Sequence, residues 1–201
     1  MPNIKVIPNF VSPEDVQTLI SYIDQNCEDP NIFRKQTGRA HNEGLAYRSI
    51  FPIEKSHTVH DPKILSMLVD YANKFIQEAK KHYDYDGDVY IEGISLTKLT
   101  DGIQLRIHKD KHGIYPSLYS GMLYLNDDFE GGEIVFLDEY TPKTDFDIYT
   151  SDMGGLVHSP SPGELVIFQG GTWHGSHKVS KSPRYAIALW SITEKDFSFK
   201  Y

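Results

Sequence analysis

Two imidazoles, one carboxylate and one guanidinium, at positions 108, 174, 110 and 184, are the side chains of this sequence best suited to chemistry. His108 and Asp110 stand two positions apart, so on an extended strand both side chains leave the same face. Two His and one carboxylate, with His174 as the second His, cover one face of an octahedral metal ion and leave three positions open. That arrangement is typical of non-haem Fe(II) sites that bind an organic molecule and O2 together. Arg184 adds a guanidinium that can hold a carboxylate through two parallel hydrogen bonds, so we expect an iron site beside an anchor for an acidic molecule.

Context is needed to support this site, because the His-x-Asp pattern occurs a second time at His82 and Asp84. His82 lies where a helix is expected to end, and residues two apart on a helix diverge. We therefore interpret that pair as a solvent-facing helix end. A zinc hydrolase is a second alternative, because His108 and His112 have the required four-residue spacing. The pattern lacks the neighbouring Glu base, however, which disfavours that class.

Among the remaining histidines, one is an alternative to His174 as a metal ligand. His177 competes with His174 for the place of the second His, and we expect it to be a turn residue instead. His112 and His158 are expected in surface loops.

Composition excludes several classes of protein. The chain has 201 residues, of which 39% are hydrophobic and 24% charged, as expected for one globular domain with a substantial core. Its net charge of -8 would repel a phosphate backbone, so nucleic acid is disfavoured as a partner. Cys27 is the only cysteine, which excludes an intrachain disulfide. The N-terminus lacks a secretory pattern and no apolar run is long enough to cross a bilayer, so we expect a cytoplasmic protein without membrane contact.

The first part of the chain carries two helix patterns. Ser12 and Pro13 begin one helix as N-cap and first helical residue, and Asp61 and Pro62 begin a second that runs to about Lys81. Between them, residues 34–48 are polar and contain two glycines. We expect a loop there, and we hypothesise that it is a lid that orders over bound substrate.

From residue 90 onward, short apolar or alternating runs predict antiparallel strands. They cover residues 90–99, 103–108, 119–125, 134–137, 165–168 and 185–192. Residues 170–174 are expected to end the fifth of these strands, and the acidic, aromatic segment 139–158 is expected to be a long inserted loop. Repeated short strands of this kind favour a sandwich or barrel, and a double-sheet jelly roll suits the length. The expected organisation is a single domain over residues 1–201, with helical support over about 1–89 and a jelly-roll core over about 90–192.

The last strand is expected to shape a pocket. Arg184, Ala186, Ala188 and Trp190 share one face by the period of two. An Arg at the mouth with two Ala behind it leaves a slot for a small dicarboxylate that reaches from Arg184 to the metal. Trp190 is a candidate for the substrate side of this pocket, and a packed core Trp is the alternative.

Several ordered motifs over about residues 90–192 resemble the 2-oxoglutarate and Fe(II)-dependent oxygenases, above all the prolyl 4-hydroxylase branch. The start of the chain, residues 7–12, is similar as well. The motifs are His108-Lys109-Asp110, Tyr124-Leu125-Asn126, the Gly-Gly-Glu-Ile-Val-Phe run at 131–136, the Ser-Pro-Gly-Glu-Leu-Val-Ile-Phe run at 161–168, His174 and the Arg-Tyr-Ala-Ile-Ala-Leu-Trp run at 184–190.

The resemblance implies a mainly β fold, a double-stranded β-helix with supporting N-terminal helices. It implies Fe(II) held by His108, Asp110 and His174, with the distal carboxylate of 2-oxoglutarate bound by Arg184 and Tyr124. It also implies O2 as a reactant, ascorbate as the reductant, and hydroxylation of a C–H bond with conversion of 2-oxoglutarate to succinate and CO2. A proline in a protein or peptide is the leading substrate.

Two departures from the family pattern bear on that substrate. Leu105 and Ser117 stand where prolyl hydroxylases commonly carry a Tyr and an Arg near the peptide. Hydroxylation of a free amino acid or another small molecule is therefore an alternative. A jelly-roll module that binds metal without turnover is a second one.

Overall fold

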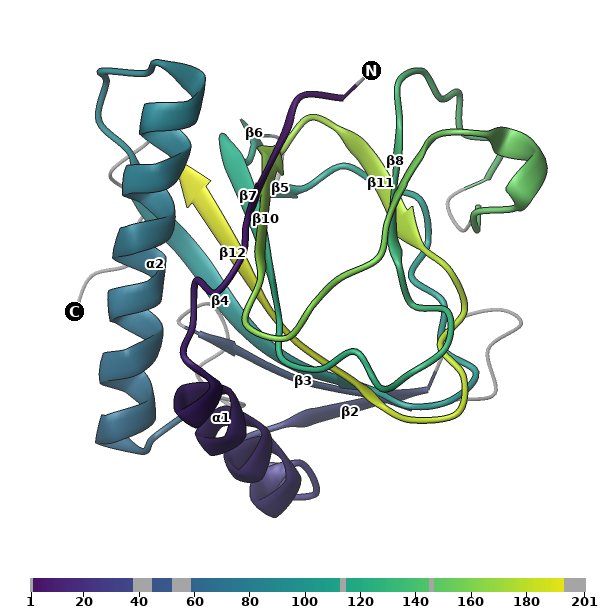
Figure 1. Cartoon of the computed structure of the whole chain (residues 1–201). Helices are drawn as coiled ribbons and strands as arrows, with labels where there is room; N and C mark the ends of the chain where they lie inside the picture. Colours follow the sequence, from purple (N-terminus) through teal and green to yellow (C-terminus); the bar gives the residue numbers. More distant parts are fainter. Residues whose placement is uncertain (1, 38–44, 52–58, 113–114, 145–146, 194–201) are drawn as a thin grey trace.

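The computed structural model describes residues 2–37, 45–51, 59–112, 115–144 and 147–193. Two helices and most of the strands belong to one layered arrangement, in which the helices lie on one side of a large sheet and a smaller sheet lies on the other (Figure 1). In this part of the chain, neither helix is long and apolar enough to span a membrane.

Both helices begin where the sequence predicts. Helix α1 (Pro13–Asn26) follows Ser12, whose hydroxyl accepts a hydrogen bond from the Asp15 amide at 3.1 Å. Helix α2 (Pro62–Tyr83) follows Asp61, whose carboxylate accepts from the amides of Lys63 and Ile64. These caps satisfy amide groups that the first helical turn leaves without partners.

The large sheet has seven antiparallel strands in the order β1-β10-β7-β12-β4-β3-β2. Its strands are β1 (Ile4–Ile7), β10 (Leu165–Gln169), β7 (Tyr119–Tyr124), β12 (Arg184–Ile192), β4 (Tyr90–Leu99), β3 (Leu45–Phe51) and β2 (Arg34–Thr37). One face of this sheet packs against α1 and α2 in an apolar core that includes Leu19, Leu68, Phe75, Leu96 and Ile187. That core fixes the back of the sheet, so the opposite face is available for a site.

The smaller sheet has the order β11-β8-β9, with strands β11 (Trp173–Ser176), β8 (Ile134–Leu137) and β9 (Leu156–His158). Phe136 on β8 packs edge-on against Phe168 on β10 at 5.0 Å between ring centroids, which joins the two sheets through their inner faces. A two-stranded ribbon of β5 (Lys111–His112) and β6 (Tyr115–Pro116) and one 3-10 turn, η1 (Ser151–Met153), complete the described elements. The predicted jelly roll with N-terminal helical support is confirmed.

The expected loop at residues 34–48 is wrong at both of its ends. Residues 34–37 form β2 and residues 45–51 form β3, which pairs with β4 and extends the large sheet. Ala46 and Tyr47 are buried on opposite faces of β3, and polar residues are acceptable on β2 because it is the edge of the sheet. The middle of the hypothesised lid, residues 38–44, lies outside the described residues.

The strand expected at 103–108 is also wrong, because only His108 forms an isolated bridge there. Gly102 has a φ of 91° and turns the chain at the end of β4. Beyond it the backbone bonds to side chains and loops, as when the Leu105 amide donates to the Ser176 hydroxyl and the Ile107 amide to the Asp147 carbonyl. Apolar alternation alone cannot reveal such a replacement of strand pairing.

Two further expectations need correction. Residues 170–174 do not end β10, because β11 begins at Trp173 in the other sheet. The expected loop at 139–158 contains η1 and β9, and His158 lies on β9, half-buried, with its Nε2 2.5 Å from a Glu164 carboxylate oxygen.

Candidate functional site

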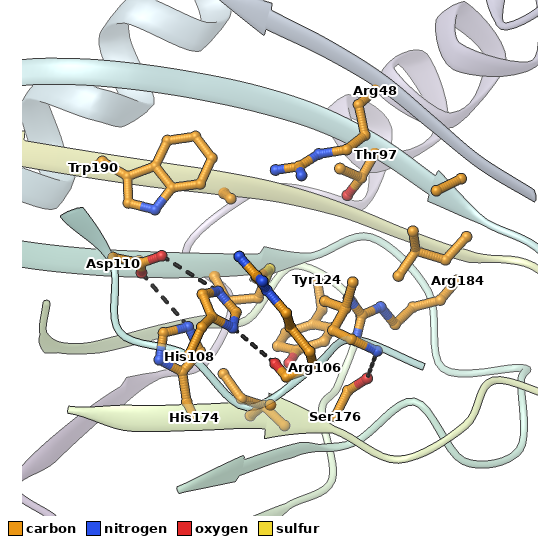
Figure 2. A pocket seen from close by; sticks show the side chains of 18 of the residues that line it. Arg48, Thr97, Arg106, His108, Asp110, Tyr124, His174, Ser176, Arg184 and Trp190 are labelled. Carbon is orange, nitrogen blue, oxygen red and sulfur yellow. Dashed lines mark hydrogen bonds and ion pairs between the residues drawn. The ribbon is translucent and has the colours of Figure 1, made fainter. Parts of the chain in front are cut away.

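His108 and His174 are brought together by the backbone. Each residue's amide donates to the other's carbonyl, at 2.8 Å and 2.9 Å, as in a hydrogen-bonded pair of antiparallel strands. Residues directly opposite in such a pair project their side chains from the same face. The two imidazole rings accordingly lie 4.3 Å apart between centroids (Figure 2).

Asp110 completes the cluster from the same segment as His108. Its amide donates to the Gly170 carbonyl at 3.0 Å, which ties it to the turn between β10 and β11. One carboxylate oxygen lies 3.5 Å from His108 Nε2 and the other lies 3.5 Å from His174 Nε2. One ligand atom from each of the three residues lies within 4.8 Å of the others, so these atoms could hold one metal ion.

Backbone carbonyls orient both imidazoles. His108 Nδ1 lies 2.8 Å from the Arg106 carbonyl, and His174 Nδ1 lies 3.0 Å from the Thr172 carbonyl. A carbonyl only accepts, so each Nδ1 carries the proton and each Nε2 lone pair faces the cluster. Fixing the tautomer through the second nitrogen is the usual support of a metal-binding imidazole.

The protonation states suit a cation as well. Burial lowers the pKa of His174 to about 4, so this imidazole is neutral near neutral pH. Burial opposes ionisation of Asp110, but the facing imidazoles of His174 and His108 hold its pKa below the ordinary value. Two imidazole nitrogens and a carboxylate form a donor set of the kind that binds Fe(II) with open positions.

The cluster opens onto a cavity of about 240 Å³ on the inner face of the large sheet. Besides the three cluster residues, the cavity is lined by Ala46, Arg48, Thr97, Leu99, Leu105, Arg106, Gly121, Met122, Tyr124, Ile134, Phe168, Gly175, Ser176, Arg184, Ala188 and Trp190. Arg184, Ala188 and Trp190 come from one face of β12, as predicted. Ala186, which was expected beside Ala188 in the slot, is buried and is not among the lining residues. The predicted metal ligands, Arg184, Tyr124 and Trp190 all line this one pocket.

Arg184 and Tyr124 form a buried polar pair at this pocket. Arg184 is 2% exposed, and one of its terminal nitrogens donates to the Gly132 carbonyl at 2.6 Å. Its Nε and the Tyr124 hydroxyl have no hydrogen-bond partner among the described residues. Burial lowers the pKa of Arg184 and raises that of Tyr124 to about 12, so the pair presents a cation and a neutral donor. Groups of this kind are costly to bury unless an anion binds there.

Two of the other described histidines have partners away from this cluster. His177 pairs its Nδ1 with a Glu133 carboxylate oxygen at 2.8 Å, and His82 Nε2 lies 3.1 Å from the Asn3 side chain near the end of α2. His112 lies on β5. Within the described residues, the potential metal cluster includes His174 and omits its rival His177.

Arg48 is one of the lining residues that the sequence did not predict, because it falls in the segment expected to be a loop. The run from Tyr47 to Phe51 contains aromatic and β-branched residues, which favour a strand. That signal could have placed Ala46 and Arg48 on one face of β3. The two residues that depart from the family pattern lie in different places. Leu105 lines the cavity, whereas the Ser117 hydroxyl donates to a buried Glu92 carboxylate at 2.7 Å.

The comparisons with known proteins agree with this geometry. Residues 94–192 match the family model described as the 2OG-Fe(II) oxygenase superfamily. Human Prolyl 3-hydroxylase 2 is 40% identical over 74 residues, which are 36% of this chain and 9% of that protein. Human Prolyl 3-hydroxylase 3 is 36% identical over a match of the same extent. This chain therefore matches only a small part of the length of these curated relatives.

Solved structures support the fold. A Pseudomonas putida prolyl-4-hydroxylase superposes with a TM-score of 0.66 and 13% identity, covering 96% of this chain and 94% of that one. A prolyl hydroxylase from Trichoplax adhaerens, in complex with a hypoxia inducible factor peptide fragment, has a TM-score of 0.65 and 15% identity, covering 98% of this chain and 86% of that one. At such identities the likeness establishes a shared architecture.

Proposed function

We propose that this chain is a 2-oxoglutarate- and Fe(II)-dependent dioxygenase that hydroxylates a substrate C–H bond, because residues 94–192 match the model of the 2OG-Fe(II) oxygenase superfamily. One observation carries the proposal. The buried guanidinium of Arg184, whose Nε has no partner among the described residues, and the buried hydroxyl of Tyr124, which also has none there, share a cavity with a cluster of two His and one carboxylate. Together they offer a place for a metal ion and a place for an anion within one pocket.

His108, Asp110 and His174 would hold Fe(II). Their backbone hydrogen bonds fix the ligand atoms before the metal arrives, because the His108–His174 pair and the Gly170 carbonyl position all three residues. When bound, Fe(II), 2-oxoglutarate and O2 supply the oxidative decarboxylation to succinate and CO2 and the hydroxylation of a C–H bond. The protein's part is to orient the reactants and to limit the access of water, for which apolar lining residues such as Met122 and Phe168 are suited.

Arg184 and Tyr124 would bind the distal carboxylate of 2-oxoglutarate. The Arg184 guanidinium is held by the Gly132 carbonyl, so its remaining donors keep one orientation. The Tyr124 hydroxyl, with its pKa raised to about 12 by burial, stays protonated and can donate to the same carboxylate. The two groups recognise a carboxylate at the far end of a ligand that reaches to the metal.

The substrate that we propose is a proline in a protein or peptide, hydroxylated in a prolyl 4-hydroxylase type of reaction, with ascorbate as the reductant. The names of the matched relatives support a prolyl substrate, and Trp190 in the cavity wall would pack against it. Leu105 and Ser117 differ from the family pattern, so the peptide contacts would differ from those of prolyl hydroxylases that carry a Tyr and an Arg there.

Mass spectrometry of a library of proline-containing peptides and free amino acids tests this function. The protein is incubated with Fe(II), 2-oxoglutarate and ascorbate in air, with His108→Ala as the inactive control. We expect a proline-containing peptide to gain one oxygen atom with the wild-type protein and not with His108→Ala. Oxygen gain only on free amino acids would mean that the substrate is a small molecule and not a peptide. No gain on any compound would count against prolyl hydroxylation.

A further inference from the structure

Three hydroxyl groups line the cavity among the described residues, those of Thr97, Tyr124 and Ser176. The Thr97 hydroxyl donates to the Ala186 carbonyl at 2.9 Å, so its proton already has an acceptor. The Tyr124 hydroxyl would donate to the cosubstrate carboxylate. Ser176 is 1% exposed, so its hydroxyl must find its partners inside the protein or in a ligand.

The Ser176 hydroxyl keeps a proton that it can donate. Its oxygen accepts a hydrogen bond from the Leu105 amide at 3.0 Å, which fixes where this oxygen lies. A hydroxyl has one proton besides its acceptor lone pairs, and an amide N–H can only donate. Of the hydrogen bonds between described residues, none has the Ser176 hydroxyl as its donor. The group is therefore held in place with its donor still unused within this part of the chain.

The smaller sheet places Ser176 between the metal cluster and Arg184. On β11, Ser176 follows His174 by two residues, so both side chains leave the same face of the strand. Opposite Ser176 on β8 is Ile134, which also lines the cavity. Two residues before Ile134, the Gly132 carbonyl accepts from the Arg184 guanidinium. A ligand that reaches from Arg184 to the metal would therefore pass beside Ser176.

We infer that the Ser176 hydroxyl donates a hydrogen bond to the distal carboxylate of the cosubstrate, beside Arg184 and Tyr124. The inference rests on the proposed function and adds a third donor to its cosubstrate site. A carboxylate has two oxygens with about four acceptor positions, and a buried carboxylate needs partners on both oxygens. Figure 2 shows Ser176 on the side of the pocket where Arg184 and Tyr124 lie, away from Asp110.

Two keto acids test the inference. 2-Oxobutanoate has the same keto-acid end as 2-oxoglutarate but no distal carboxylate. Each is titrated anaerobically into Fe(II)-loaded protein and followed by the absorbance band of the complex. We expect Ser176→Ala to weaken 2-oxoglutarate binding about tenfold, the effect of a hydrogen bond to a charged group, and to leave 2-oxobutanoate binding unchanged.

A second variant and a matched control accompany this change. Because Ser176→Ala also removes the acceptor of the Leu105 amide, Ser176→Cys is measured beside it. A thiol fills the same place and is a weak donor, so we expect the same selective loss of 2-oxoglutarate affinity. Ser95→Ala is the control. Ser95 is a buried serine of β4 that does not line the cavity, so its replacement should leave both affinities unchanged.

An equal loss of affinity for both keto acids in the Ser176 variants would overturn the inference, because the cause would then lie at the metal end or in the fold. Unchanged 2-oxoglutarate affinity in these variants would overturn it too. If 2-oxobutanoate gives no band, the Co(II) affinity of the variants takes its place, and we expect it to equal that of the wild-type protein. A wild-type band with 2-oxoglutarate that Ser176→Ala reproduces at equal affinity refutes this inference alone. If the wild-type protein gives no band, the proposed function fails with it.

Discussion

Arg184 is a buried cation that makes no ion pair with any described residue, and this makes it the sharpest single-residue test of cosubstrate binding. We predict that Arg184→Ala weakens 2-oxoglutarate binding by roughly tenfold to a hundredfold, because a charge-assisted hydrogen bond contributes about 1.5–3 kcal/mol. The change is measured by anaerobic absorbance titration of the Fe(II)-loaded protein. Arg34→Ala, which removes an exposed arginine from outside the cavity, serves as the control. An unchanged affinity of Arg184→Ala for 2-oxoglutarate would show that Arg184 does not bind the cosubstrate carboxylate.

Replacing Tyr124 by Phe should affect the stability of the protein and its affinity for 2-oxoglutarate differently. Its hydroxyl is buried without a partner among the described residues, so Tyr124→Phe should leave the stability of the ligand-free protein unchanged or raise it by up to about 1 kcal/mol. The same change should weaken 2-oxoglutarate binding several-fold, because a donor to the carboxylate is lost. Thermal unfolding and the absorbance titration measure the two effects. A destabilised protein with normal affinity would mean that the hydroxyl has a structural role.

At the scale of elements, the turn between β10 and β11 determines where Asp110 lies. The Gly170 carbonyl accepts from the Asp110 amide, and the Gly170 amide donates to the Leu118 carbonyl at 3.1 Å. A Cβ atom at Gly170 would lie 2.1 Å from the Ser117 carbonyl oxygen, whereas a Cβ at the neighbouring Gly171 would meet nothing within 4 Å. Only the first glycine is required by a close approach of backbones.

We therefore predict that Gly170→Ala lowers the free energy of unfolding by about 1–3 kcal/mol, the usual range for overpacking, and weakens metal binding. Gly171→Ala should change both quantities little. Thermal unfolding and a titration with Co(II), followed by absorbance, measure them. Equal behaviour of the two alanine variants would show that the turn does not position Asp110.

The elements also show what the sequence can predict and what it cannot. The helix caps at Ser12 and Asp61 and the strands over 90–99 and 134–137 have strong local signals, and the structure has them at those positions. The pairing of His108 with His174 has no local signal, because the backbone bonds that join them link residues far apart in sequence. Arg48 on β3 was missed for a related reason, since the polar edge strand β2 beside it resembles a loop until its pairing with β3 is known.

At the scale of the whole molecule, ligand binding should be coupled to stability, because a ligand that binds only the folded state stabilises it. We predict that Fe(II) under anaerobic conditions raises the melting temperature of the wild-type protein relative to protein treated with chelator. The expected gain is about 2.7 kcal/mol at a metal concentration a hundred times the dissociation constant. His177→Ala should show the same metal-dependent shift, and His174→Ala should lose it. A shift that depends on His177 and not on His174 would reverse the assignment of the second imidazole.

Succinate formation tests whether the cluster of His108, Asp110 and His174 and the buried pair of Arg184 and Tyr124 serve one reaction, as we propose. The wild-type protein, incubated in air with Fe(II), 2-oxoglutarate and ascorbate, is predicted to produce succinate well above the level given by His174→Ala under the same conditions. Equal succinate from the two proteins, or none above a protein-free blank, would mean that the cluster does not support turnover of 2-oxoglutarate.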